Sequence, residues 1–163
     1  MAVELYRIDD RLIHGQVVVG WGQPLDLRFI VLVDDEVAAS DWEQELYRMG
    51  VPPDMDVFFD HVEDAAHNLE RYVADPRSGL LLTGDIQTMA RLVEATGAIE
   101  QVNLGGIHHR QGRNQHLRYV FLTAAEADAL RRLAAAGVEV TAQDVPAARP
   151  IPLDELLDGT GTA

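Results

Sequence analysis

The stretch GLLLTGDIQTMARLVEATGAIEQVNLG, residues 79–105, decides the fold. It holds two short apolar runs, 79–83 and 101–105, on either side of a longer stretch, 85–97, whose pattern predicts a helix. Leucines fill the first run consecutively, as expected of a strand that is covered on both faces. A strand, a helix and a second strand in this order predict one unit of a parallel sheet.

The same alternation continues through the chain in both directions. Further strand-like runs lie at about 3–8, 28–34, 55–60, 118–122 and 137–143, and further helix-like stretches lie at about 14–22, 40–50, 61–74, 123–136 and 152–158. Capping boxes are predicted at Ser40 with Glu43 and at Thr123 with Glu126, and Gly137 suits the position after a helix. We therefore expect an α/β fold: a single doubly wound domain whose mostly parallel sheet has six to seven strands with helices on both faces.

The carboxyl-terminal part of the chain has a proline-rich segment, the helix-like stretch 152–158 and a short tail. Residues 146–152, PAARPIP, are rich in proline, which excludes a regular helix or a central strand there. We expect one domain over residues 1–158, and a frayed tail over 159–163.

Composition excludes several classes of function. The chain has no cysteine, which excludes thiolate chemistry, and its thirteen basic residues are all arginine, which excludes a Schiff-base lysine. A formal net charge of −14 argues against binding to nucleic acid or to anionic lipid. There is no apolar run of membrane-spanning length and no signal-peptide pattern, so we expect a cytoplasmic protein.

Candidate chemistry gathers after the first predicted strand, in IDDRLIHGQV, residues 8–17. In a sheet of this kind, ligands bind beyond the carboxyl ends of the strands. His14 has the side chain of a phosphoryl acceptor, since a neutral imidazole is nucleophilic near pH 7. Asp10 is placed to fix the imidazole tautomer, and Arg11 to meet phosphate oxygens. The plainer alternative is an ordinary loop histidine beside a helix cap and a surface arginine.

Residues 6–17, YRIDDRLIHGQV, resemble the active-site loop of the mannose/fructose/sorbose IIB family of the bacterial phosphoenolpyruvate-dependent sugar phosphotransferase system. Later segments resemble this family in the same order, and the resemblance covers roughly residues 3–157. These segments are VLVDDEVA (31–38), LYRMGVPPDMDV (46–57), LLLTGDIQTMARLVEATGAI (80–99) and VNLGGIHHRQGRNQ (102–115).

This resemblance implies a protein-histidine phosphotransferase. A IIA domain would donate a phosphoryl group to His14, which would pass it to a sugar bound by the membrane subunits IIC and IID, at the inner face of the membrane. Asp10, Arg11 and Gly15 match the supporting loop, and Thr83 matches a hydroxyl-bearing position near the phosphate; the alternative role of Thr83 is to cap the following helix. The resemblance implies neither metal nor cofactor, and self-association fits it. The resemblance also implies that sugar selectivity belongs largely to the membrane subunits.

Two departures from the family pattern keep a second function open. Asp85 places a negative charge near the expected phosphate, and His108 and His109 stand where members often have a small and an aromatic residue. Residues 101–125 contain no Asp or Glu but do contain Arg110 and Arg113, which, with the histidine pair, suggest a docking segment for a phosphorylated partner. The alternatives are an uneven surface and, for the whole chain, a IIB-like regulatory or interaction module.

Two other classes of protein fit the sequence poorly. A two-component receiver domain needs a lysine near its phosphate, and the chain has none. A metal hydrolase built on Asp34, His108 and His109 would lack a recognised ligand spacing.

Overall fold

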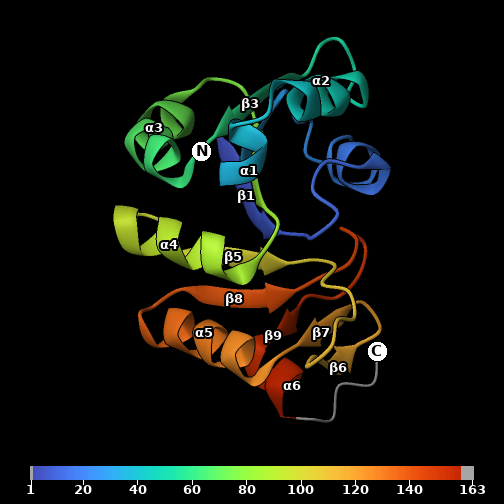
Figure 1. The fold of residues 1–163 in the computed structure, drawn as a ribbon, viewed down its shortest axis with the longest axis vertical. Coiled ribbons are helices and arrows are strands. Elements are labelled where there is room, and N and C mark those ends of the chain that lie inside the picture. The colour runs from blue at the N-terminus through green and yellow to red at the C-terminus, as the bar shows by residue number, and fades with distance from the viewer. Residues whose placement is uncertain (1, 159–163) are drawn as a thin grey trace.

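The computed structural model describes residues 2–158, so the predicted tail at 159–163 lies outside the described residues. The main sheet has seven strands in the order β3-β2-β4-β1-β5-β8-β9 (Figure 1). Their bounds are β1 (Val3–Ile8), β2 (Phe29–Val33), β3 (Asp56–Asp60), β4 (Gly79–Thr83), β5 (Gln101–Leu104), β8 (Glu139–Ala142) and β9 (Ile151–Pro152). All neighbours pair in parallel except β9, which is antiparallel to β8. The α/β class and the mostly parallel sheet are confirmed.

Helices connect the strands and cover the sheet. They are α1 (Asp35–Ala38), α2 (Asp41–Met49), α3 (Val62–Ala74), α4 (Ile86–Thr96), α5 (Ala124–Ala135), α6 (Leu153–Leu157) and a π-helix, η1 (Gln16–Trp21). The six helix-like stretches predicted from the sequence correspond to η1 and α2 to α6. Within residues 2–158, no helix is long and apolar enough to cross a bilayer.

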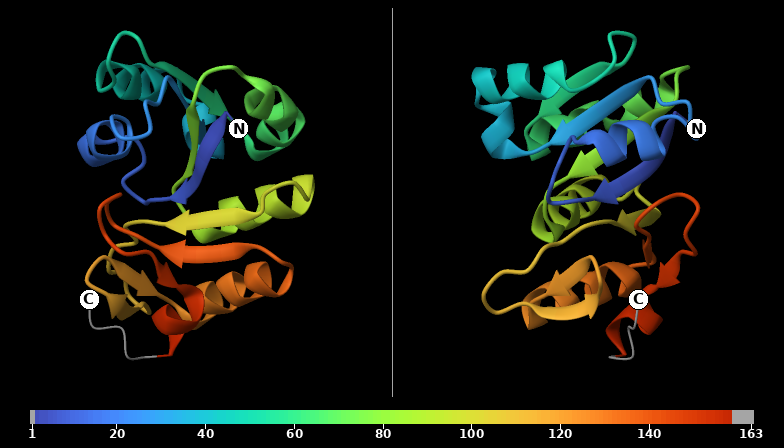
Figure 2. Two further views of the ribbon diagram at one scale, coloured as in Figure 1. Left: turned by 180° about the vertical axis from the view of Figure 1, so that it is seen from behind. Right: turned by 90° about the vertical axis from the view of Figure 1, so that its right-hand side faces the viewer.

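The hydrophobic core has two parts, one on each face of the sheet. The larger part is formed by α3, α4, α5 and α6 against alternate residues of the strands, such as Val31 and Leu81. The smaller part is formed by η1, α1 and α2 against the intervening residues, such as Ile30 and Leu82. In the left view of Figure 2, η1 and α2 lie on the same side of the molecule. Helices on both faces are what the consecutive apolar residues of β2 and β4 predict.

Four features differ from the sequence prediction: the placement of β7 (Val120–Leu122), and the presence of β6 (Asn114–Leu117), α1 and β9. The run at 118–122 contributes β7, which pairs antiparallel with β6 in a separate two-stranded sheet. The polar sequence NQHL gave no sign of β6, and α1 is a single turn that Asp34 caps. The proline-rich segment supplies β9 at the edge of the sheet, where Pro152 needs no backbone donor.

The sheet forks between β1 and β5. β1 pairs with β4 from Val3 to Ile8, but it pairs with β5 only at Arg7 with Asn103 and at Ile8 with Leu104. The two strands therefore lie together at their carboxyl ends and separate toward their amino ends.

Candidate functional site

The loop after β1 is fastened to the strands on both sides of it. Asp9 N–H donates to the Thr83 carbonyl at 2.9 Å, and Asp10 N–H donates to the Gly106 carbonyl at 2.9 Å. Leu12, with φ 58°, turns the chain in the left-handed region, and its N–H donates to the Asp9 carbonyl at 3.0 Å. These contacts place the loop at the carboxyl ends of β1, β4 and β5.

A buried cluster of charges, Arg7, Asp9 and Arg11, lies beneath this loop. Arg11 donates to Asp9 from Nε and Nη2, at 3.2 Å each, and from its backbone N–H at 3.1 Å. Arg7 Nη2 donates to the same carboxylate at 3.3 Å. Arg7 and Asp9 are fully buried, whereas the Arg11 side chain is 35% exposed. Arg11 is therefore held by a fixed partner and still reaches the surface.

Burial and charge act against each other in this cluster. Burial lowers the pKa of Arg7, while the Asp9 carboxylate acts in the opposite direction. Burial also works against the charge of Asp9, but the hydrogen bonds from Arg11 and the charge of Arg7 outweigh it and hold the pKa of Asp9 below its usual value. The Asp9 carboxylate is therefore ionised at neutral pH between its two arginine partners.

Arg7 is enclosed by several elements. Its Nη1 donates to the Asn103 side-chain oxygen and to the Gln143 carbonyl, the latter at 2.9 Å. Its guanidinium lies 4.8 Å from the centre of the Trp21 ring. A Cβ on Gly105 would come within 2.3 Å of Arg7 Nη2, so only glycine fits there. Neither Arg7 nor this role of Asp9 was predicted, although residues 7, 9 and 11 share the two-residue spacing of one side of an extended chain.

His14 follows in the same loop, and its carbonyl accepts from Val18 N–H at the start of η1, at 3.0 Å. Its Nδ1 lies 2.8 Å from the Leu12 carbonyl oxygen, which accepts a hydrogen bond when that nitrogen carries the proton. Its Nε2 is buried and has no hydrogen-bond partner among the described residues. Gly15 is exposed at the amino end of η1, and a Cβ there would meet nothing within 4 Å.

Asp10 does not fix the His14 tautomer, and that expectation is corrected. Its carboxylate accepts from the His108 backbone N–H at 2.7 Å, and its other oxygen lies 2.6 Å from His108 Nδ1. The peptide carbonyl of Leu12 takes the position beside His14 instead. Asp10 therefore joins the His14 loop to the loop that follows β5.

The predicted docking residues fall into two groups. Arg113 is withdrawn from the surface: it makes a bidentate ion pair with Glu126, with side chains 9% and 7% exposed, and it donates to the His108 carbonyl at 2.8 Å. His109 and Arg110 are exposed, and the His109 ring lies edge-on to Phe121. The prediction that Arg113 helps to dock a partner is therefore wrong, because Glu126 already neutralises its charge.

Thr83 and Asp85 lie at the end of β4. Thr83 is fully buried, and its hydroxyl donates to the Asp85 carbonyl at 3.2 Å. Asp85, not Thr83, caps α4, because its side chain accepts from Thr88 N–H at 2.7 Å. The Asp85 carboxylate is thus engaged at the start of the helix.

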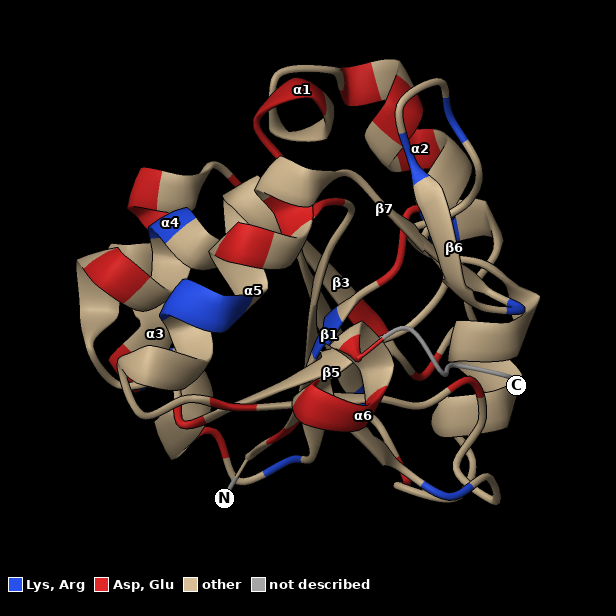
Figure 3. Ribbon diagram, turned by 90° about the horizontal axis from the view of Figure 1, so that it is seen from below, with Lys and Arg blue, Asp and Glu red and all other residues tan. Residues whose placement is uncertain are grey.

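Acidic residues outnumber basic ones along the chain, with 27 Asp and Glu against 13 Arg. Figure 3 shows acidic residues over α1, α2, α5 and α6, with fewer basic ones. Among residues 2–158, no group of three or more His, Cys, Asp or Glu side chains is arranged to hold a metal ion.

A family model described as PTS system sorbose subfamily IIB component matches residues 3–162. The mannose-specific EIIAB component of the phosphotransferase system of Escherichia coli K12 is 35% identical over 148 residues, which are 89% of this chain and 45% of that protein. The chain therefore spans about half the length of that relative. The N-acetylgalactosamine-specific phosphotransferase enzyme IIB component 2 of the same strain is 32% identical over 155 residues, 95% of this chain and 98% of that protein.

Solved structures agree with these relatives. The N-acetylgalactosamine-specific IIB component 1 from Escherichia coli matches with a TM-score of 0.84 and 31% identity, over 91% of this chain and 97% of that one. The IIB domain of the sorbose permease from Klebsiella pneumoniae matches with a TM-score of 0.85 and 28% identity, over 96% of both chains.

Proposed function

Since the chain belongs to the sorbose subfamily of IIB components of the sugar phosphotransferase system, we propose that His14 carries the phosphoryl group between a IIA donor and a sugar bound by IIC and IID. The observation that supports this most is the position of His14. It stands at the carboxyl end of β1, in the same short loop as Arg11, whose guanidinium is anchored on a buried carboxylate. Residues 1–158 would form the phosphocarrier unit.

The chemistry needs a nucleophilic nitrogen and a compensating charge. A lone pair of the imidazole attacks phosphorus in line, the bond between phosphorus and the donor nitrogen breaks, and its electron pair returns to the donor. Arg11 faces the surface and offsets the charge of the transferred oxygens. Thr83 is buried beneath the loop and would support the backbone at Asp85, not the phosphate directly.

His14 has to turn before it reacts. In this conformation Nδ1 is close to the Leu12 carbonyl and Nε2 is buried, so neither nitrogen faces an incoming donor. A rotation about the side-chain bonds would release one nitrogen to the surface at little cost, because the ring makes a single hydrogen bond with the described residues. The contact with Leu12 would hold the neutral ring between transfers.

The relatives' names include mannose, N-acetylgalactosamine and sorbose, so similarity at this level assigns no sugar. The negative charge of Asp85 near the expected phosphate was one reason to consider a purely regulatory role. This reason is weaker now, because the Asp85 carboxylate is engaged as a helix cap. Transfer onward to a sugar is therefore the function we favour.

Incubation with a phosphorylated IIA domain tests the assignment of His14. We expect one acid-labile, base-stable phosphate per chain, lost in His14→Ala and retained in His109→Ala, which removes an exposed histidine of the docking segment. Equal labelling of His14→Ala and the unmodified protein would refute the assignment.

A further inference from the structure

The fork between β1 and β5 encloses a cavity of about 820 Å³. It opens where the two strands separate, at the amino ends of β1, β5 and β8, and the carboxyl ends of α3 and α4 complete it. The candidate site lies at the opposite ends of these strands. A cavity of this size is within the range that holds small organic ligands.

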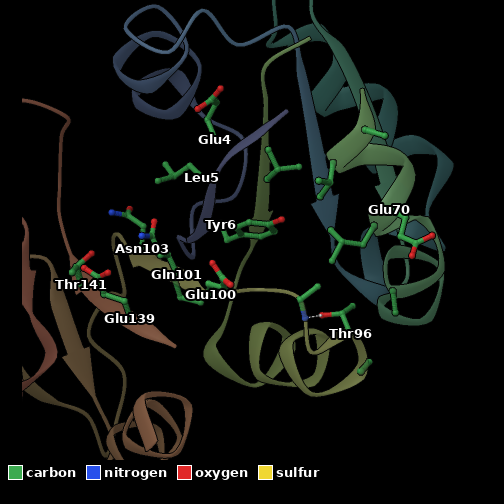
Figure 4. Close-up of a pocket in the computed structure, with 18 of the residues that line it drawn as sticks. Glu4, Leu5, Tyr6, Glu70, Thr96, Glu100, Gln101, Asn103, Glu139 and Thr141 are labelled. Carbon is green, nitrogen blue, oxygen red and sulfur yellow. Dashed lines mark hydrogen bonds between the residues drawn. The ribbon is translucent and has the colours of Figure 1, made fainter. Parts of the chain in front are cut away.

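The cavity is lined by both apolar and polar side chains (Figure 4). The apolar lining residues include Tyr6 and Val73 on the side of the larger core part and Leu5 on the other side of the sheet. The polar lining residues include Asn103 and Thr141, which lie on one face of β5 and β8. The alternate residues of these two strands point to the opposite face and belong to the core. A ligand that fits both kinds of side chain has a carbon skeleton with polar groups along it.

The charge of the cavity has one sign. Glu4, Glu70, Glu100 and Glu139 line it, and no arginine is among the described lining residues. The lining also includes the last residues of α3 and of α4, where the helix dipole adds partial negative charge. Figure 4 shows Glu4, Glu70, Glu100 and Glu139 around the cavity. An anionic ligand such as a sugar phosphate is disfavoured there, and a cation is favoured.

The inner end of the cavity approaches the charge cluster. Asn103 and Gln143 line it, and both also hold Arg7, through the Asn103 side chain and the Gln143 carbonyl. Asn103 Nδ2 donates to Gln143 Oε1 at 3.3 Å, so these two residues together form a partition between the cavity and Arg7. Because Arg7 is positive behind this partition, a cationic ligand would direct its charges toward the glutamates at the other end.

We propose that this cavity binds an aliphatic polyamine, whose ammonium groups meet the glutamates while its methylene segments lie along Leu5, Tyr6 and Val73. The ammonium groups are donors without acceptor capacity, which matches carboxylates and amide oxygens. The carbon segments bury against these apolar side chains. This site is separate from His14 and does not depend on phosphoryl transfer.

Titration calorimetry with spermidine at low ionic strength tests the proposal on the unphosphorylated protein. We expect saturable binding with one site per chain, weakened about fivefold in Glu100→Gln/Glu139→Gln, since two exposed charge contacts are lost. Glu45→Gln/Glu63→Gln is the matched control: it changes the net charge equally on exposed helix positions outside the cavity lining, and binding should stay within twofold of the unmodified protein.

A second variant separates shape from charge. Ala98→Trp fills part of the cavity without changing any charge and should weaken binding as much as the glutamate pair. Absence of saturable binding would overturn the proposal. Equal weakening by the two glutamine pairs, or unchanged binding in Ala98→Trp, would also overturn it, because spermidine would then be attracted only by the general negative charge of the surface.

Discussion

Asp9→Asn tests whether the charge cluster under the loop is the support of the site. Asp9 accepts four hydrogen bonds, three from Arg11 and one from Arg7. The amide of asparagine keeps the shape and one acceptor oxygen, but it removes the negative charge between two guanidinium groups. Arg7 would remain fully buried with no carboxylate partner.

The magnitude follows from burial. Removing one partner of a buried ion pair costs about 3–5 kcal/mol, because the other charge stays uncompensated. Arg7 keeps its contacts with Asn103, Gln143 and Asp144, which favours the lower end, about 3 kcal/mol. For a chain of this length, each kcal/mol shifts the melting temperature by about 2–4 °C, so we expect a fall of about 6–12 °C.

Thermal unfolding followed by circular dichroism measures this effect. Asp10→Asn is the matched control, because it removes the neighbouring carboxylate from a pair whose His108 partner is 59% exposed, and we expect a loss below about 1 kcal/mol. If both variants lose the same stability, the reasoning about burial is wrong.

Acid provides a second test of the same cluster. The pKa of Asp9 is lowered in the folded protein, so its contribution is present above the usual value of 3.8 and is lost as the pH falls through the lowered pKa. The difference in stability between the unmodified protein and Asp9→Asn should therefore shrink below pH 3.8. A difference that stays constant down to pH 2, measured by urea unfolding, would contradict the assignment of the stability to this charge.

Two further predictions concern the loop after β5. Glu126→Gln should lower the free energy of unfolding by about 3 kcal/mol at neutral pH, since Arg113 is then buried without its partner. This difference from the unmodified protein should shrink below pH 4.5, because the pKa of Glu126 is lowered in the folded protein. Urea unfolding measures the difference, with the exposed Glu155→Gln as control. His108→Ala should slow phosphate uptake from IIA several-fold with little loss of stability, because Asp10 loses its contact with the imidazole but keeps the hydrogen bond from the His108 N–H. His109→Ala should not slow the uptake. Equal rates for the two variants would exclude a positioning role of His108 through Asp10.

The fold was largely predictable because its elements carry local signals. Consecutive apolar residues predicted β2 and β4, and Thr123 with Glu126 forms both halves of the predicted capping box. Gly137 follows α5 with φ 97°, as a residue after a helix should. The features that were missed depend on distant partners: β6 and β9 become strands only because β7 and β8 lie beside them.

The site was predictable in its position but not in its pairings. The sequence placed Asp10 beside His14, since the two are four residues apart, but the partner of Asp10 is 98 positions away in the chain. Arg11 was expected to meet phosphate oxygens, but its anchor on a buried carboxylate was not predicted. Composition alone assigns charged residues to the surface, which is why Arg7 was not considered.

The ion pairs of Asp9 with Arg7 and Arg11 matter because a phosphoryl group on His14 has to be held and then released. Two arginines share one carboxylate, so the cluster has a net charge of about +1 beneath the loop, and Asp10 is turned toward His108 and away from His14. Without Asp9, the two guanidinium groups would repel each other and bind phosphate more strongly. Without Arg7, Asp9 would neutralise Arg11 completely and leave nothing to offset the transferred charge. Since a carrier has to stabilise the transition state more than the phosphorylated state, a single anchored positive charge suits His14 better than either extreme.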